Sequence, residues 1–339
     1  MVKFTLPHNF LRFKIKAQTD VGVARREIDG FKDLPYFTPL TLAEAKLVIT
    51  ELGSNLVKYA GGGEIIFRFS GLSGFIEIMA YDQGPGIKNF TKSFEDGYST
   101  GGSSGSGLGA IKRFSSKLIF ASIPGDFTCF YAQLKNKDAP KKPLSHFDHH
   151  WINFAIPGQK TSGDWTGIEE TKEETHFLLM DGLGHGSEAA DSSTSVGNYF
   201  RRNFNLSPES LWEGMFQEAN AKRGGVLGFG EIHHEKEELT FFGMGNVQAA
   251  IYQYGEKPKH LISKSGLFGK DQNLPKPQIL PFPKGAILVL HSDGLSNVTS
   301  KDFPSELYGK ESPVIAAYLM HKKIRNTDDA SILIIKNDL

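Results

Sequence analysis

A polar, proline-containing segment near the middle of the chain is the feature that most constrains its fold. The segment reads Asn136-Lys-Asp-Ala-Pro-Lys-Lys-Pro-Leu144, a composition typical of a linker. A chain of 339 residues is also longer than one hydrophobic core usually serves. We therefore predict two domains, at residues 1–135 and 150–339, joined by a linker at 136–149.

Charge and cysteine content exclude several classes of protein. Lys plus Arg and Asp plus Glu number 38 each, so no electrostatic argument favours nucleic acid or an anionic membrane as partner. The single cysteine, Cys129, excludes an intramolecular disulfide framework and suits a reducing compartment. No run approaches the roughly 20 apolar residues that span a bilayer. We expect a soluble, cytoplasmic protein whose partner is a protein or a nucleotide.

Hydrophobic spacing in the first half predicts a mixture of helices and strands. Apolar residues recur every three or four positions from Leu42 to Tyr59, as on one face of a helix. Thr19 or Asp20 can cap an earlier helix. The Gly- and Ser-rich segment 88–109 reads as a functional loop. The other expected elements are helices at 21–32 and 108–116 and strands at 10–17, 64–69, 75–81, 117–122 and 127–134.

The second half consists mainly of short β-like runs interrupted by helical patterns, which predicts an α+β domain of packed antiparallel sheets flanked by helices. The expected strands are at 151–156, 175–181, 226–233, 238–243, 247–254, 286–292 and 330–336. The expected helices are at 187–203, 208–222 and 312–323.

Three segments of the first half have a chemistry suited to a nucleotide. Glu51 and Asn55 are four residues apart on the predicted helix, so a carboxylate and an amide share one face. Asp82 follows a strand and can accept a hydrogen bond from an amino group such as that of adenine. Each segment alone is also compatible with an ordinary polar stripe, turn or linker. The glycines that would let the backbone approach a ligand or expose N–H groups to phosphates are Gly84, Gly86, Gly105, Gly107 and Gly109.

Together these segments resemble the N, G1 and G2 boxes of the GHKL ATPase superfamily, and over residues 8–135 the chain is most similar to the anti-sigma-factor-type serine kinases (RsbT-, RsbW- and SpoIIAB-like). The resemblance implies ATP and Mg²⁺ as cofactors, Asn55 as metal ligand, Asp82 on adenine, and Glu51 as the base that activates a Ser or Thr of a small partner protein. One feature departs from this pattern. Lys88 and Lys92 lie near the start of the loop, but no basic residue from 93 to 104 could contact a γ-phosphate.

Acidic residues recur at strand ends in the second half. Asp181-Gly182 ends one apolar run, Asp293-Gly294 ends another, and Asp328 precedes a third. Any one Asp-Gly pair is compatible with a simple turn. Three carboxylates at strand ends can converge, however, and such oxygen ligands favour Mg²⁺ or Mn²⁺ over zinc. Gly163-Asp164 adds a fourth carboxylate.

The run Asp181-Gly-Leu-Gly-His-Gly186, followed by Ser292-Asp293-Gly294 and Asp328-Asp-Ala-Ser331, resembles the PPM (2C-type) metal-dependent Ser/Thr phosphatases. Over 150–337 the chain is most similar to their stress and sporulation branch (RsbX-, RsbU- and SpoIIE-like). The resemblance implies two Mn²⁺ or Mg²⁺ ions, with Asp181 bridging both, the Gly182 carbonyl beside it, and Asp293 and Asp328 completing the site. Asp164 would hold metal-bound water, Asp329 would be structural, and His185 would belong to the loop rather than bind metal.

These resemblances imply a bifunctional regulator of a bacterial partner-switching pathway, with an N-terminal GHKL (Bergerat-type) α/β sandwich and a C-terminal PPM-type β-sandwich flanked by helices. The first domain would bind ATP and phosphorylate, or at least dock on, a STAS-type anti-sigma-factor antagonist, and the second would dephosphorylate a phosphoserine or phosphothreonine on it or on a relative. Two alternatives remain open. The first domain could be a non-catalytic ATP sensor that gates the phosphatase, or the protein could be a non-enzymatic, anti-sigma-like binding protein.

Overall fold

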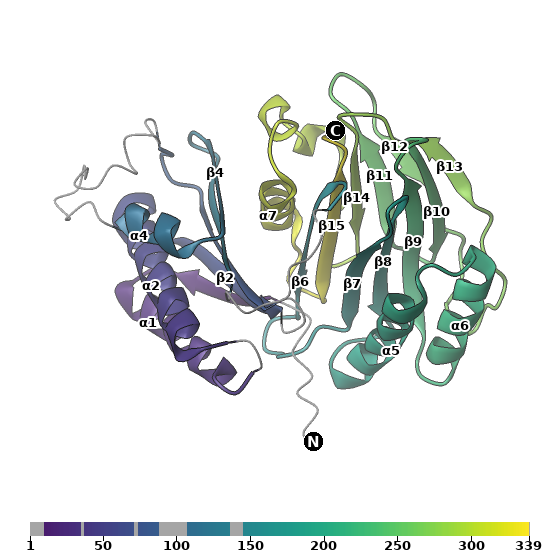
Figure 1. Ribbon diagram of the computed structural model, residues 1–339, viewed down its shortest axis with the longest axis horizontal. Coiled ribbons are helices and arrows are strands. Elements are labelled where there is room, and N and C mark those ends of the chain that lie inside the picture. The colour runs from purple at the N-terminus through teal and green to yellow at the C-terminus, as the bar shows by residue number, and fades with distance from the viewer. Residues whose placement is uncertain (1–9, 35–36, 71–73, 88–106, 136–144, 339) are drawn as a thin grey trace. The chain divides into compact units, whose positions relative to one another are not determined.

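The computed structural model describes residues 10–34, 37–70, 74–87, 107–135 and 145–338, which belong to two compact units (Figure 1). Unit 1 contains the described residues up to 135, and unit 2 contains those from 145 onward. Strand β6 (Asp148–Phe154) begins before the predicted linker at 136–149 ends, so the last two residues of that range belong to a strand.

Unit 1 is an antiparallel sheet with helices on one face (Figure 1). Its strand order is β1-β2-β3-β5-β4. A short 3₁₀ helix at Ile28–Phe31 and a π-helical turn at Leu56–Ala60 extend two of the helices. The main elements are β1 (Leu11–Ile15), α1 (Gln18–Glu27), α2 (Pro39–Asn55), β2 (Gly63–Ser70), β3 (Phe75–Asp82), α4 (Gly107–Phe114), β4 (Lys117–Ile123) and β5 (Phe127–Lys135).

The core of unit 1 lies between this sheet and its helices. Alternate residues of β2, such as Ile65 and Phe67, point toward the helices because side chains alternate across a strand. They meet the apolar stripe of α2, which includes Val48, Ile49 and Leu52. The predicted helix at 42–59 is therefore confirmed: α2 and the π-helical turn after it cover this range, and Glu51 and Asn55 lie in the last turns of α2.

Both helix starts in unit 1 differ from the prediction. Helix α2 begins three residues earlier, because Pro39 suits the first helical position and the Thr38 hydroxyl accepts a hydrogen bond from the Thr41 amide at 3.2 Å. Helix α1 begins after Ala17, not at residue 21. Asp20 acts from inside the first turn, where its carboxylate accepts hydrogen bonds from the amides of Lys16 and Ala17.

Unit 2 contains two five-stranded antiparallel sheets, ordered β13-β10-β9-β8-β7 and β12-β11-β14-β15-β6. Its remaining elements are β7 (Asp164–Glu170), β8 (Glu174–Gly182), α5 (Ser187–Asn203), α6 (Pro208–Asn220), β9 (Gly225–His233), β10 (Glu238–Met244), β11 (Gln248–Tyr252), β12 (Lys259–Leu261), β13 (Gln278–Pro281), β14 (Ile287–His291), α7 (Ser312–Lys323) and β15 (Ala330–Lys336).

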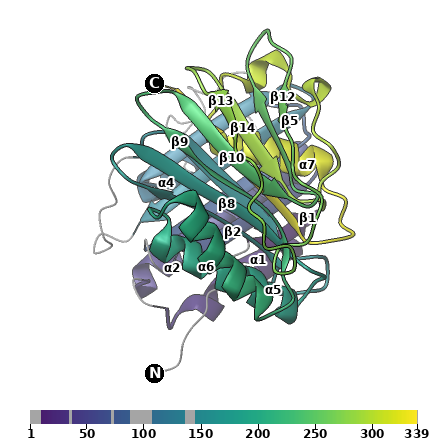
Figure 2. The same cartoon turned by 90° about the vertical axis from the view of Figure 1, so that its right-hand side faces the viewer.

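Four layers result in unit 2. The sheets pack face to face around residues such as Phe177 and Leu179 of β8 and Leu288 of β14. Helices α5 and α6 cover the outer face of the first sheet, where Leu178 and Met180 meet them (Figure 2). Helix α7 packs on β6 and β15 of the second sheet. The predicted β-sandwich flanked by helices is thus present.

Among the residues described, the longest helices, α2 and α5, each have 17 residues. No helix in this part of the chain is long and apolar enough to cross a membrane. Helices α5 and α7 coincide with the predicted ranges 187–203 and 312–323. Strands β7, β12 and β13 were not predicted.

Candidate functional site

Two of the acidic residues in unit 2 stand opposite each other on neighbouring strands. Asp164 is the first residue of β7, and Asp181 is the next-to-last residue of β8. The two are direct partners in the antiparallel ladder. Because directly opposed residues project from the same face of a sheet, both carboxylates emerge on one side.

The second sheet brings two more carboxylates to the same place. Asp293 follows β14 by two residues, and Asp328 precedes β15 by two residues. The charges of both, together with that of Asp164, contribute to raising the pKa of the Asp181 carboxyl well above its usual range, after burial as the largest cause. The four predicted acids therefore form one electrostatically coupled cluster, which we call the acidic centre: Asp164, Asp181, Asp293 and Asp328.

A serine hydroxyl joins the two sheets at the acidic centre. The Ser292 Oγ donates a hydrogen bond to Asp164 Oδ2 at 2.8 Å and accepts one from the Ser331 amide at 2.9 Å. Ser292 is fully buried. The sequence motif Ser-Asp-Gly contained this residue, but its role as a bridge depends on a contact 128 positions away along the chain, which no local pattern reveals.

Asp329, predicted to be structural, has no free carboxylate oxygen. Its Oδ1 accepts from the Ile156 amide at 2.7 Å, and its Oδ2 accepts from the Gly163 amide at 2.6 Å. Only 4 % of the residue is exposed. Asp329 therefore fixes the loop that leads into Asp164, while its neighbour Asp328 belongs to the acidic centre.

The donor set of the acidic centre fits a hard divalent cation. Burial is the largest cause that raises the pKa of Asp164 to about 7, and the negative charges of Asp329 and Asp293 add to it. Its Oδ1 is buried and has no hydrogen-bond partner among the described residues. A buried carboxylate oxygen without a donor, exposed to the charges of other carboxylates, is a group that Mg²⁺ or Mn²⁺ would satisfy. Asp164, Asp181, Asp293 and Asp328 would be the residues that hold such ions.

Glycines allow the backbone to close tightly around the acidic centre. A Cβ at Gly182 would lie 2.5 Å from the Ala189 carbonyl oxygen, and one at Gly294 would overlap the Asp329 carbonyl oxygen. These positions therefore accept only glycine without displacement of backbone. The glycines of these two Asp-Gly pairs thus allow Gly182 to approach α5 and Gly294 to approach the backbone at Asp329.

Two further side chains, His185 and Asn246, lie close in sequence or in space to residues of the acidic centre. His185 is exposed, and its Nδ1 contacts Gln159 Nε2 at 2.6 Å, consistent with a place in the loop. Asn246 Nδ2 donates to Asp293 Oδ2 at 2.8 Å. Sequence analysis missed Asn246, because a lone Asn after β10 gives no signal without the fold.

In unit 1, the predicted carboxylate and glycine box lie together. A Cβ added to Gly107, the first residue of α4, would overlap Glu51 Oε2, so the carboxylate lies directly against the Gly107 backbone. Gly109 is buried in the same helix. Asn55 is the last residue of α2 before the π-helical turn. The start of α4 and the end of α2 therefore face each other.

The Asp82 turn has the expected close backbone approach. Asp82 Oδ1 accepts a hydrogen bond from the Gly84 amide at 2.8 Å, while burial raises the pKa of the carboxyl. A Cβ at Gly84 would lie 2.8 Å from Ala60 Cα. Gly86 has φ of 76°, a conformation that favours glycine. Gly105, Lys88 and Lys92 lie outside the described residues.

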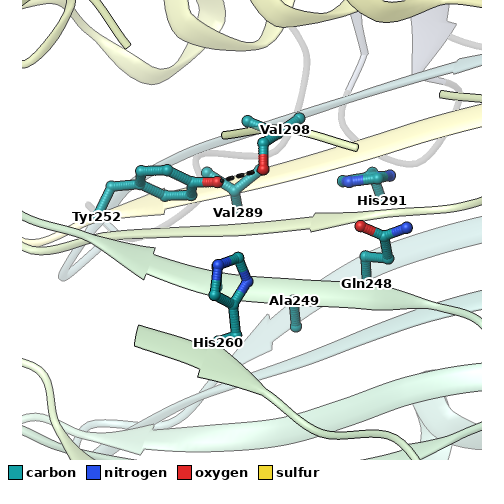
Figure 3. Close-up of a pocket in the computed structure, with 8 residues that line it drawn as sticks. Gln248, Ala249, Tyr252, His260, Val289, His291 and Val298 are labelled. Carbon is teal, nitrogen blue, oxygen red and sulfur yellow. Dashed lines mark hydrogen bonds between the residues drawn. The ribbon is translucent and has the colours of Figure 1, made fainter. Parts of the chain in front are cut away.

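A small pocket in unit 2 is separate from the acidic centre. It has a volume of about 10 Å³ and lies on β11, β12 and β14 (Figure 3). His260, His291 and Gln248 line it together with apolar side chains. This space holds about one water molecule. The pocket contains none of the four carboxylates and is too small for a substrate.

Comparisons with known proteins agree with this geometry. The family model described as Stage II sporulation protein E (SpoIIE) matches residues 171–337. The chain is 36 % identical over 118 residues to the serine/threonine-protein kinase RsbT of Bacillus subtilis, covering 34 % of this chain and 88 % of RsbT. It is 28 % identical over 140 residues to the phosphoserine phosphatase RsbX of Bacillus subtilis, covering 41 % of this chain and 70 % of RsbX.

A solved structure supports the fold assignment. The crystal structure of RsbX in complex with magnesium superimposes with a TM-score of 0.50 at 24 % identity and covers 57 % of this chain and 96 % of that one. Homologues of this kind are PPM-type Ser/Thr phosphatases, which are metal-dependent enzymes. The chain belongs to the partner-switching family of RsbT, and it is a PPM-type, metal-dependent Ser/Thr phosphatase that is similar to RsbX and SpoIIE.

Proposed function

We propose that the acidic centre holds two Mn²⁺ or Mg²⁺ ions and removes phosphate from a serine or threonine of a STAS-type anti-sigma-factor antagonist or a related phosphoprotein. The observation that carries the proposal is the buried, unpartnered Oδ1 of Asp164 within a cluster of four carboxylates. The partner follows from the relatives, since RsbX is a phosphoserine phosphatase and RsbT a protein kinase of the Rsb partner-switching pathway.

Each acid has a distinct part in this proposal. Asp181, which feels the charges of all the others, would bridge the two ions, with the Gly182 carbonyl beside it. Asp293 and Asp328 would complete the ligand set, and Asp164, held by Ser292, would orient metal-bound water. When bound, the ions supply Lewis-acid activation of a water molecule and of the phosphate ester.

Substitution of the ligands tests this assignment. Asp181→Asn and Asp293→Asn should each lower Mn²⁺-dependent hydrolysis of a phosphoserine protein by about 100-fold or more, because each removes a negative metal ligand. Asp338→Asn is the matched control, because this exposed carboxylate pairs with Lys336 outside the acidic centre. Full activity of both ligand variants at saturating Mn²⁺ would sink the assignment.

We further propose that unit 1 binds ATP with Mg²⁺ and phosphorylates the same class of partner. The contact of Glu51 with the start of α4, the Asp82–Gly84 turn and the 36 % identity of the chain to a serine/threonine kinase support this. Asn55 would bind Mg²⁺, Asp82 would accept from the adenine amino group, and Glu51 would act as base. A role in the cytoplasm, where ATP is available, is part of the same proposal.

A sensor role for unit 1 is the alternative favoured by the departure of the loop sequence from the kinase pattern. Segment 93–104 has no basic residue for a γ-phosphate. In that case ATP would bind and change phosphatase activity, no label would pass to the partner, and Glu51→Ala would leave every measured function intact. The non-enzymatic alternative has lost its support, because the phosphatase relatives of the chain are enzymes.

A further inference from the structure

A second group of metal-ligating side chains lies far along the same sheet from the acidic centre. It comprises Glu174 and His176 of β8 and Glu231 of β9 (strands labelled in Figure 1). One ligand atom from each residue lies within 4.8 Å of the others, and no further group of three meets this criterion in the part of the chain that the structure describes. His176 precedes Asp181 by five residues on β8, a distance of about 16 Å at roughly 3.3 Å per residue.

The sheet itself places these three side chains together. Glu174 and His176 share the face of β8 that carries Leu178 and Met180 toward the helices, because side chains alternate along a strand. Glu231 is the direct partner of His176 across the ladder and therefore projects on the same face. The cluster thus belongs to the helix-covered side of the first sheet, not to the space between the sheets.

The imidazole of His176 is buried without a satisfactory partner. The residue is only 4 % exposed, and the ring of Phe204 contacts it at 5.3 Å between centroids. Its Nε2 has no hydrogen-bond partner among the described residues. The Glu174 Oε2 lies 3.3 Å from this nitrogen.

Both ring nitrogens of His176 face negative charge. Glu174 approaches Nε2, and Glu231 Oε2 lies 3.7 Å from Nδ1. A neutral imidazole carries one N–H, so one nitrogen lone pair must face a carboxylate. The nearby Arg201 does not relieve this, because it donates to Glu169 at 3.0 Å.

The pKa directions agree with a need for a cation. Burial is the largest effect on His176 and lowers its pKa, although Glu174 opposes the shift. Burial likewise raises the pKa of Glu231, and the charge of Glu174 adds to it, while His233 and Lys236 oppose it. Burial therefore disfavours the charged forms of both side chains, and a bound cation would offset part of that cost for the glutamate.

We propose that Glu174, His176 and Glu231 bind a divalent transition-metal ion of the kind that imidazole prefers, with Zn²⁺ as the first choice. One imidazole nitrogen and two carboxylate oxygens supply three ligands, and water can fill a fourth position through the partly exposed glutamates. The ion fastens β8 to β9 at the end of the sheet remote from the acidic centre. It differs from the ions of that centre because only this site contributes a nitrogen ligand.

Zinc binding to the full-length protein tests the proposal. The protein is freed of metal with a chelator and then dialysed against Zn²⁺ with Mg²⁺ in excess, which competes for the all-oxygen acidic centre. We expect His176→Gln and Glu231→Gln each to bind about one Zn²⁺ fewer per chain than the wild type, since each removes one of three ligands. Asp181→Asn should keep this zinc, and so should His260→Gln, which removes an exposed histidine on β12.

Thermal unfolding provides a second readout that does not depend on activity. Zn²⁺ should raise the melting temperature of the wild type and of His260→Gln but not that of Glu231→Gln. Glu231→Gln decides the matter if His176→Gln fails to fold, because the Glu231 side chain is 28 % exposed and Gln has the same shape. Equal zinc content and equal thermal shifts in the wild type and Glu231→Gln would overturn the proposal.

Discussion

Adjacent acidic residues in unit 2 have different surroundings, and these surroundings decide what each can do. Asp328 contributes its charge to the acidic centre, whereas both carboxylate oxygens of Asp329 accept hydrogen bonds, from the amides of Ile156 and Gly163. The sequence pair Asp-Asp does not distinguish them, whereas the resemblance to a phosphatase motif predicts a metal ligand at Asp328 and a structural role at Asp329. A carboxylate with an oxygen that accepts no hydrogen bond from the protein can bind a metal ion, whereas one whose oxygens are both occupied holds the backbone in place.

Loss of the Asp329 carboxylate should weaken the fold. Asp329→Ala leaves the amides of Ile156 and Gly163 without their acceptor, which we expect to lower the free energy of unfolding by about 1–3 kcal/mol. Urea unfolding of the metal-free protein measures this. Asp293→Ala is the control, because among the described residues Asp293 accepts a hydrogen bond only from the exposed Asn246 side chain, and its loss relieves charge repulsion within the acidic centre. An equal loss in both variants would contradict the structural role of Asp329.

Asp164 should make the stability of the metal-free protein depend on pH. Its folded pKa of about 7 exceeds the unfolded value of 3.8, so between these values the folded state holds a proton that the unfolded state releases. The free energy of unfolding should therefore fall as pH rises through this window, by at most about 1.4 kcal/mol per pH unit for one group.

The comparison with Asp164→Asn isolates this effect from other titrating groups. In chelator, the variant should gain stability relative to the wild type as pH rises from 5 to 7, as urea unfolding at each pH would record. Saturating Mg²⁺ should remove or reverse the difference, because the ionised carboxylate then has a cation. Parallel stability curves for the two proteins in chelator would show that Asp164 does not titrate in this range.

At the scale of elements, hydrophobic periodicity correctly predicted the helices and strands that bury a regular apolar pattern. Helices α5 and α7 begin and end as expected: α5 buries apolar and small residues along its length, and α7 is buried from Ser312 to Met320. Strand β7 was missed because it reads Asp-Trp-Thr-Gly-Ile-Glu-Glu, in which few apolar residues alternate. Strands β12 and β13 were missed because they are short and lie at sheet edges. These strands form because neighbouring strands pair with them, and their own residues do not predict them.

The start of α1 shows the limit of cap prediction in the same way. A side chain able to cap, Asp20, was identified, but it acts from within the first turn while Ala17 occupies the cap position.

For the candidate site, the sequence supplied the four carboxylates and the glycines. It could not supply Ser292 as a bridge between sheets or Asn246 beside Asp293, because both roles arise only when distant strands meet.

The contact between Glu51 of α2 and the start of α4 requires that residue 107 have no side chain, which a substitution can test. In Gly107→Ala the new methyl group displaces the Glu51 carboxylate, which can move without unfolding the helix because it ends a flexible side chain. We expect ATP affinity to fall by about tenfold, a loss of roughly 1.4 kcal/mol, with little change in melting temperature. Gly30→Ala is the control, since nothing lies near its Cβ. Unchanged ATP affinity in Gly107→Ala would separate this contact from nucleotide binding.

At the scale of the whole molecule, two units with separate cores carry two different sets of functional residues on one chain. Unit 2 has the fold of the PPM-type phosphatases and contains the acidic centre, the proposed metal site. Unit 1 is a helix-covered antiparallel sheet with a carboxylate held against a glycine-led helix. In our account, opposing activities encoded in a fixed one-to-one ratio set the phosphorylation level of a shared partner, and the supply of ATP or metal shifts the balance.

The most direct test of this account incubates the purified protein with γ-labelled ATP, Mg²⁺ and a STAS-domain protein from the same genome. Wild type is compared with Asp181→Asn, which retains unit 1 and should lose dephosphorylation. The account predicts that label accumulates on the partner with Asp181→Asn and is removed again when wild-type protein and Mn²⁺ are added. Absence of label with both proteins, while ATP still binds and alters phosphatase activity, would contradict the kinase role and make unit 1 a sensor.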